Sequence, residues 1–167
     1  LNLTNTIAKR DFRERMMDSN PIEQERGITI KMAPVRMIYE LNHKLIQKYH
    51  ANHAILNLID TPGHVDFSYE VSRSLQAVEG ALLLVDATQG VQAQTLSHYY
   101  KALEQDLKII PVLNKIDLSN ADVDGVTLEM MELFGFHEDE FVHVSAKTGI
   151  GVENLLATII ERIPAPI

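Results

Sequence analysis

Three short polar clusters in this sequence each follow a run of apolar residues that is typical of a buried β-strand. The clusters are Asp60-Thr61-Pro62-Gly63-His64, Asn114-Lys115-Ile116-Asp117 and Ser145-Ala146-Lys147. In an open α/β sheet the carboxyl ends of the parallel strands lie along one edge, and that edge is where ligands bind. We therefore expect the three clusters to converge on one site.

The middle cluster indicates which ligand this site would take. The carboxylate of Asp117 can accept two hydrogen bonds from guanine, one from N1–H and one from the exocyclic amine, and adenine has no such pair of donors. A buried acceptor of this kind discriminates strongly, because the wrong base would leave it unpaired. Asn114 and Lys115 would brace the loop and cover the face of the base. The turn at 145–147 would supply a backbone amide toward the base oxygen.

The first cluster has residue types suited to a phosphate and its metal ion. Asp60 ends a predicted strand, where a carboxylate can hold the water shell of Mg²⁺. Gly63 lets the backbone approach a terminal phosphate and offers its amide to it. His64 is then placed to orient a water for in-line attack or to stabilise charge there. A lone histidine is more often a surface or core residue, but this context favours His64 as catalytic, with Thr61 and Pro62 among the nucleotide-binding residues.

A second candidate ligand for the metal ion lies upstream. The run Arg26-Gly27-Ile28-Thr29-Ile30 places the Thr29 hydroxyl at the entry of a predicted edge strand. There it could bind Mg²⁺ only when a terminal phosphate is present, which makes Thr29 a candidate switch residue. Taken alone, the same run is simply a β-prone strand.

The elements that must position these clusters follow an α/β pattern. From Ala54 onward, short apolar runs alternate with segments of helical period, which predicts repeated βαβ units and a mostly parallel sheet. We predict four strands, at 54–59, 81–86, 108–113 and 141–145. Four apolar stripes at helical spacing predict helices and should belong to the core. The stripes are Phe67, Val71, Leu75 and Val78; Leu96, Tyr99, Tyr100 and Leu103; Val126, Met130, Leu133 and Phe134, ending at Gly135; and Leu155, Leu156, Ile159, Ile160 and Ile163, stopped by Pro164.

Upstream of these elements we predict an antiparallel hairpin at the edge of the sheet. The run 28–41 is typical of one long strand, and the polar segment 42–53 is typical of the turn onto the next strand. The first 26 residues carry a dense set of charges without a clear strand, which is typical of a surface segment.

Composition narrows the class of protein. At 167 residues, with 46% hydrophobic and 23% charged residues, the chain has the size and composition of one folded domain. The absence of cysteine excludes disulfides and thiolate metal sites. A formal net charge of −8 argues against a general basic face for nucleic acid. The apolar runs are far shorter than the roughly 20 residues of a membrane span.

The ordered set Arg-Gly-Ile-Thr, Asp-Thr-Pro-Gly-His, Asn-Lys-Ile-Asp and Ser-Ala-Lys resembles the translational GTPases, the group that includes elongation factors Tu and G. The segments 25–31, 56–75, 90–95 and 161–164 look like the LepA family, also called elongation factor 4. This resemblance covers nearly the whole chain. It implies a three-layer, P-loop NTPase-like GTP-binding domain over residues 1–167. It also implies that the domain binds GTP or GDP with Mg²⁺ and hydrolyses GTP on the ribosome as part of a longer protein.

One family motif does not occur in the sequence. The phosphate loop Gly-x-x-x-x-Gly-Lys-Ser/Thr appears nowhere in these residues, although the family places it before a helix whose last turn would correspond to 1–6. We therefore expect a domain truncated at its N-terminus, without its first strand. Such a gap at the centre of the sheet would leave unpaired strand edges.

Two alternatives stay open at this point. The chain could be a G-like scaffold that no longer binds nucleotide, or the GTPase could be of the elongation factor G type. The resemblance implies a monomer in the cytoplasm that contacts the ribosome, including local contact with ribosomal RNA. It leaves open a peripheral association of the longer protein with the inner face of the cell membrane.

Overall fold

The computed structural model describes residues 1, 3–6, 34–62 and 67–166. Three predicted site residues, Thr29, Gly63 and His64, lie outside the described residues. The chain divides into two compact units, Leu1–Ser74 and Leu75–Ile167. The prediction of a single domain depends on how these units sit together and stays a prediction.

The first unit contains the predicted hairpin. Strand β1 (Pro34–Glu40) pairs antiparallel with β2 (His53–Ile59) along its whole length, from Pro34 opposite Ile59 to Glu40 opposite His53. Side chains alternate across β1, so that Met37 and Tyr39 are buried while Ile38 between them is exposed. The antiparallel hairpin is therefore confirmed, and the part of the predicted long strand before residue 34 lies outside the described residues.

The connection between these strands is a helix, not the polar turn that we predicted. Helix α2 (His43–Tyr49) begins at Asn42, whose Oδ1 accepts a hydrogen bond from the Leu45 amide at 3.0 Å. It ends at His50, which adopts the left-handed conformation with φ of 52°. Leu45 is fully buried and anchors the helix. The turn prediction was wrong because one buried leucine is too weak a signal to reveal a helix of two turns.

Helix α3 (Ser68–Leu75) follows β2 and is shorter than its predicted stripe, which ran to Val78. Val71 and Leu75 are buried as expected. The chain turns at 76–77 to enter β3, which begins at Gly80, so Val78 falls in the connection and not in the helix.

The second unit is built on the predicted parallel sheet. Strands β3 (Gly80–Asp86), β4 (Lys108–Asn114) and β5 (Val142–His143) lie in the order β3-β4-β5, and both pairs are parallel. The first two strands are in register from Gly80 opposite Lys108 to Asp86 opposite Asn114. Strand β5 is shorter than the predicted 141–145, and after it the Ser145 amide donates to the Ile150 carbonyl of its own loop, at 2.9 Å, instead of extending the ladder.

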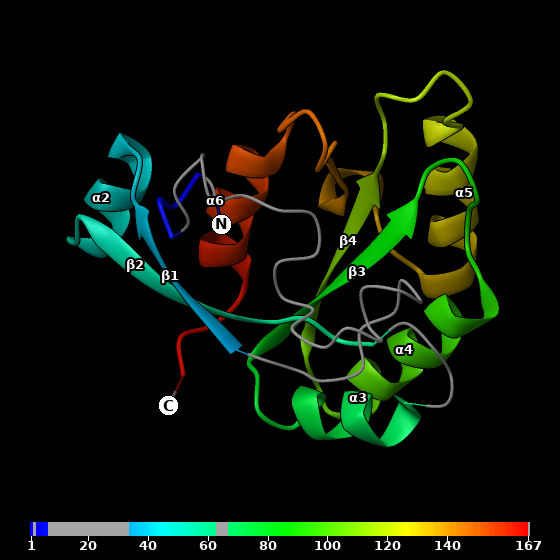
Figure 1. Cartoon of the computed structure of the whole chain (residues 1–167), viewed down its shortest axis with the longest axis horizontal. Coiled ribbons are helices and arrows are strands. Elements are labelled where there is room, and N and C mark those ends of the chain that lie inside the picture. Colours follow the sequence, from blue (N-terminus) through cyan, green and yellow to red (C-terminus); the bar gives the residue numbers. More distant parts are fainter. Residues whose placement is uncertain (2, 7–33, 63–66, 167) are drawn as a thin grey trace, which may run out of the picture. The chain divides into compact units, whose positions relative to one another are not determined.

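Three helices cover the two faces of this sheet, with α6 (Val152–Arg162) on one side and α4 (Ala93–Glu104) and α5 (Val123–Phe134) on the other (Figure 1). Under α6, buried residues of β4 and of the segment 142–144 pack with a residue of β3 and with apolar residues at 152–163. The residues are Ile110, Val112, Val142 and Val144, with Leu82, Val152, Leu155, Ile159 and Ile163 around them. On the other face, Tyr99 of α4 stacks on Phe134 of α5 with ring centroids 4.3 Å apart. The α/β fold with its three layers is confirmed in this unit.

Three residues of the predicted core stripes are on the surface. Tyr100 is 52% exposed, Leu103 53% and Leu133 45%. On α4 the buried residues are Tyr99 and Ala102. Tyr100 and Leu103 each come one position later, and one position turns a side chain by about 100° around the helix axis, away from the sheet. The predicted stop of α5 is confirmed, because Gly135 has φ of 73° and its amide donates to the Met131 carbonyl at 3.0 Å.

Within the described ranges, β1 and β2 form one sheet, and β3, β4 and β5 form another, in which β3 is paired on one side by β4. Every helix among the described residues is too short or too polar to span a bilayer.

Candidate functional site

Two of the three predicted clusters meet at the carboxyl end of the parallel sheet. Asn114 is the last residue of β4, and its Oδ1 accepts hydrogen bonds from the Lys115 amide at 2.8 Å and from the Ala146 amide at 3.0 Å. One side chain therefore ties the loop after β4 to the loop after β5. Asn114 was predicted to brace the loop after β4, and the contact that the structure shows is a bridge between two loops.

The backbone of Lys115 adopts a conformation that is uncommon for a residue with a side chain. Its φ is 64°, in the left-handed region. Such a conformation costs on the order of 1–3 kcal/mol, persists where the surroundings impose it, and clusters at functional sites. Here the bond to Asn114 and the bond from the Leu118 amide to the Lys115 carbonyl, at 3.1 Å, hold the turn.

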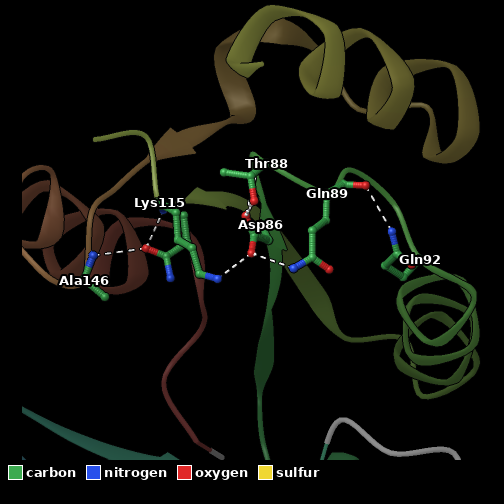
Figure 2. A network of polar contacts seen from close by, with 7 residues as sticks. Asp86, Thr88, Gln89, Gln92, Lys115 and Ala146 are labelled. Atoms are coloured by element: carbon green, nitrogen blue, oxygen red, sulfur yellow. Dashed lines mark hydrogen bonds and ion pairs between the residues drawn. The ribbon is translucent and has the colours of Figure 1, made fainter. Parts of the chain in front are cut away.

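Sequence reasoning missed a further residue at this edge, Asp86. Its Oδ2 lies 2.5 Å from the Lys115 ammonium, and its Oδ1 accepts from the amide and the hydroxyl of Thr88 at 2.9 and 2.7 Å (Figure 2). Gln89 adds a longer bond to Oδ2 at 3.3 Å. The available signal was that Asp86 is the last residue of a predicted strand, while Asp60 and Asn114 each directly follow one.

The hydrogen bonds around Asp86 also set its ionisation. Burial at the strand end would raise the pKa of this carboxyl, but the donors on Lys115 and Thr88 and the ammonium charge outweigh it. The net effect holds the pKa of Asp86 below its ordinary value, so the group is a carboxylate throughout the neutral range.

The loop after β5 is shaped by a buried serine. Ser145 is fully buried, its hydroxyl accepts from the Thr148 amide at 3.1 Å, and its carbonyl accepts from the Gly149 amide at 2.8 Å. The loop closes at Gly151, where φ is 74° and a Cβ atom would overlap the His143 carbonyl oxygen. Ser145 therefore folds the loop, whereas Ala146 and Lys147 are exposed on it.

Asp117 lies in the turn after Lys115 and is exposed. The predicted buried acceptor is therefore exposed in this structure, and a ligand bound to it would cover it. Its two oxygens can accept two donors from such a ligand, as guanine requires. The Ala146 amide is already bonded to Asn114, so a ligand oxygen would compete with Asn114 for that donor.

The first cluster belongs to the other unit. Asp60 follows β2 directly and is exposed, Thr61 is partly buried and Pro62 is fully buried. The predicted meeting of Asp60 with Asn114 and Ser145 spans the two units and stays a prediction. In the part of the chain that the structure describes, no three His, Asp or Glu side chains gather as a metal site. A magnesium ion held through its waters and substrate phosphates needs only one or two protein ligands, so Asp60 fits that chemistry.

An α/β fold with an Asn-Lys-x-Asp turn bridged to a Ser-Ala-Lys turn at the strand ends has the features of a G domain. The family described as elongation factor Tu GTP binding domain matches residues 1–165, and the chain belongs to that family.

Within this family, similar proteins carry the name elongation factor 4. One from Thermotoga maritima is 54% identical over 166 residues, which is 99% of this chain and 26% of that protein. One from Campylobacter hominis is 57% identical over 162 residues, and one from Aquifex aeolicus is 53% identical over 166, again 26% of each protein. The predicted resemblance to LepA is confirmed, and the chain spans about a quarter of the length of these relatives.

Proposed function

We propose that this chain is the guanine-nucleotide-binding domain of a ribosome-associated translation factor that hydrolyses GTP to GDP and phosphate during protein synthesis. The observation that carries the proposal is the Asn114 bridge, because it holds together the two loops that would recognise guanine. The family match and the relatives named elongation factor 4 support it.

In this proposal the base is read by the second unit. Asp117 accepts the two guanine donors, and the stem of Lys115 covers the face of the ring. Asn114 and Ser145 keep the two loops in place, and the turn at Ala146 and Lys147 offers an amide toward the base oxygen, which shares the donor with Asn114 where that amide is the one of Ala146. The site selects guanine over adenine because adenine would leave the Asp117 carboxylate without its two donors.

In this proposal, residues of the first unit bind the phosphates and the metal ion. Thr29 and Asp60 would hold Mg²⁺, and the 61–63 turn would contact the terminal phosphate. When bound, the ion would neutralise charge on the phosphates. His64 would orient the attacking water. Replacing His64 by alanine should leave nucleotide affinity nearly intact and slow ribosome-stimulated hydrolysis by orders of magnitude. Unchanged turnover would remove His64 from the mechanism.

A titration of the intact protein with fluorescent GDP, with ADP as the control, tests the nucleotide assignment. We expect a dissociation constant of about 1 μM or tighter for GDP, which is roughly −8 kcal/mol, and binding of ADP that is at least about 100-fold weaker. Equal affinity for the two nucleotides would overturn the assignment. The same titration on residues 1–167 alone addresses the scaffold alternative, and we expect much weaker binding because these residues contain no phosphate-loop motif.

The setting of the protein follows from this function. We propose that the factor works in the cytoplasm and contacts ribosomal RNA locally, since the net charge of −8 on these 167 residues does not suit a broad basic face. We propose a monomer. Neither the described residues nor the comparisons add support for a peripheral membrane association. The names of the relatives favour the elongation factor 4 branch over the elongation factor G type.

A further inference from the structure

Lys115 is held by neighbouring strands at two points, its backbone amide and the ammonium group of its side chain. Its backbone amide donates to Asn114 on β4, and its ammonium contacts Asp86 at the end of β3, 2.5 Å from Oδ2. Asp86 and Asn114 are directly opposite each other in the parallel register. The lysine stem therefore extends across the ends of two adjacent strands (Figure 2).

This contact gives a half-exposed lysine a defined position. The Lys115 side chain is 50% exposed, and a free lysine of that exposure would sample many rotamers. An exposed ion pair contributes little to the stability of a fold. The main consequence of the contact is therefore the position of the Lys115 side chain, and not the stability of the fold.

Asp86 has the properties of a rigid acceptor. Its side chain is only 20% exposed, and both oxygens are engaged, Oδ1 by the amide and hydroxyl of Thr88 and Oδ2 by Lys115 and Gln89. Two of these bonds come from the residue two positions along the chain, so the carboxylate is oriented by its own loop. A carboxylate fixed in this way can set the position of a flexible ammonium.

We propose that Asp86 is the positioning residue for Lys115, and that it raises nucleotide affinity by holding the lysine stem in place before the nucleotide arrives. This inference rests on the proposed function, in which that stem covers the face of the base. A group that is already ordered loses less conformational entropy on binding, so affinity increases without a new contact to the ligand.

Asp86→Asn in the intact protein is the direct test. The carboxamide keeps the size of the side chain and can still accept from Thr88, but it removes the charge that attracts Lys115. We expect GDP affinity to fall about tenfold, the effect of releasing one long side chain. Asp106→Asn is the matched control, since Asp106 is an exposed aspartate just before β4, at the end opposite Asn114. It should leave affinity unchanged.

A double-mutant cycle separates positioning from a general structural role. In a Lys115→Met background, Asp86→Asn should cause no further loss of GDP affinity, because the group that it positions is gone. Thr88→Val, which removes one bond to the carboxylate, should give a smaller loss in the wild-type background and none in the Lys115→Met background. Losses that add in full would overturn the proposal.

The outcomes also distinguish this inference from the proposed function. If the wild-type protein binds GDP and Asp86→Asn binds it equally well, positioning by Asp86 is refuted and the guanine site stands. If the wild-type protein does not bind GDP at all, the proposed function fails and this inference fails with it.

Discussion

At the scale of single residues, the polar side chains of the second unit divide into those that build the loops and those that face outward. Asn114 and Ser145 use their oxygens to accept backbone amides, so they shape the site. Asp117 and Lys147 are exposed on the loops that result. In the proposed function, recognition of the base falls to Asp117, so its substitution should change which base is preferred.

Asp117→Asn should exchange guanine for xanthine. A carboxylate matches the two donors of guanine, whereas a carboxamide offers one donor and one acceptor, which match the 2-oxo group and N1–H of xanthine. We expect GDP affinity to fall at least about 100-fold and xanthosine diphosphate to bind better than GDP. Competition of each nucleotide against a fluorescent probe measures both. A variant that keeps its preference for GDP would show that Asp117 does not read the base.

At the scale of elements, the loop after β5 depends on a backbone position that suits glycine alone. Gly151→Ala would place a methyl group against the His143 carbonyl at a φ of 74°. We expect a loss of at least about 1 kcal/mol in stability together with weaker GDP binding, because the loop carries Ala146. Denaturant unfolding and nucleotide titration check the two effects. The control is Gly149→Ala, which shares the positive φ without a close neighbour, and it should be milder.

Helix α4 should respond to pH through His98. Burial, together with the charge of Lys101, lowers the pKa of His98 below 6.5. A lowered pKa in the folded state means that the neutral form is preferred there, so stability is full above the unfolded value and falls as pH drops toward the folded value. Hydrogen exchange of the α4 amides should therefore be faster at about pH 5.5 than at about pH 7.5, after correction for intrinsic rates.

The matched variant for this pH effect is His98→Gln. It removes the titrating group, so the corrected exchange of α4 should change less between the two pH values. Asp86 does not interfere, because its lowered pKa keeps it ionised across this range. If the variant shows the same pH dependence as the wild type, another group is responsible.

At the scale of the whole molecule, the site as proposed draws on both units, since Asp60 lies in one and Asn114 in the other. A ligand that contacts both units stabilises them together. GDP with Mg²⁺, at 100 times its dissociation constant, should raise the free energy of unfolding of the protein by about 2.7 kcal/mol. We expect slower hydrogen exchange at 114–118 and at 56–62 in the intact protein, with no change on adding ADP. Protection confined to the first of these segments would limit the nucleotide to the second unit.

Much of this fold was predictable because its signals are local. The strands at β2, β3 and β4 are short apolar runs between polar breaks, and their predicted bounds differ from the observed ones by a residue at one end. Gly135 ended α5 as predicted, since a left-handed residue with no side chain is a local stop signal. Helix α2 was not predictable, because its one buried residue, Leu45, gives no period.

The candidate site also combines features with local sequence signals and contacts that have none. The sequence by itself determined which residue types follow each strand and how they are spaced, and this pattern is the basis for the guanine, phosphate and magnesium chemistry that we propose. Only the tertiary structure decided that Asn114 bridges two loops and that Asp86 holds Lys115. These contacts join residues that are 32 and 29 positions apart, and which of them meet depends on the strand register. A register is a property of paired strands, and no single segment of the sequence contains it.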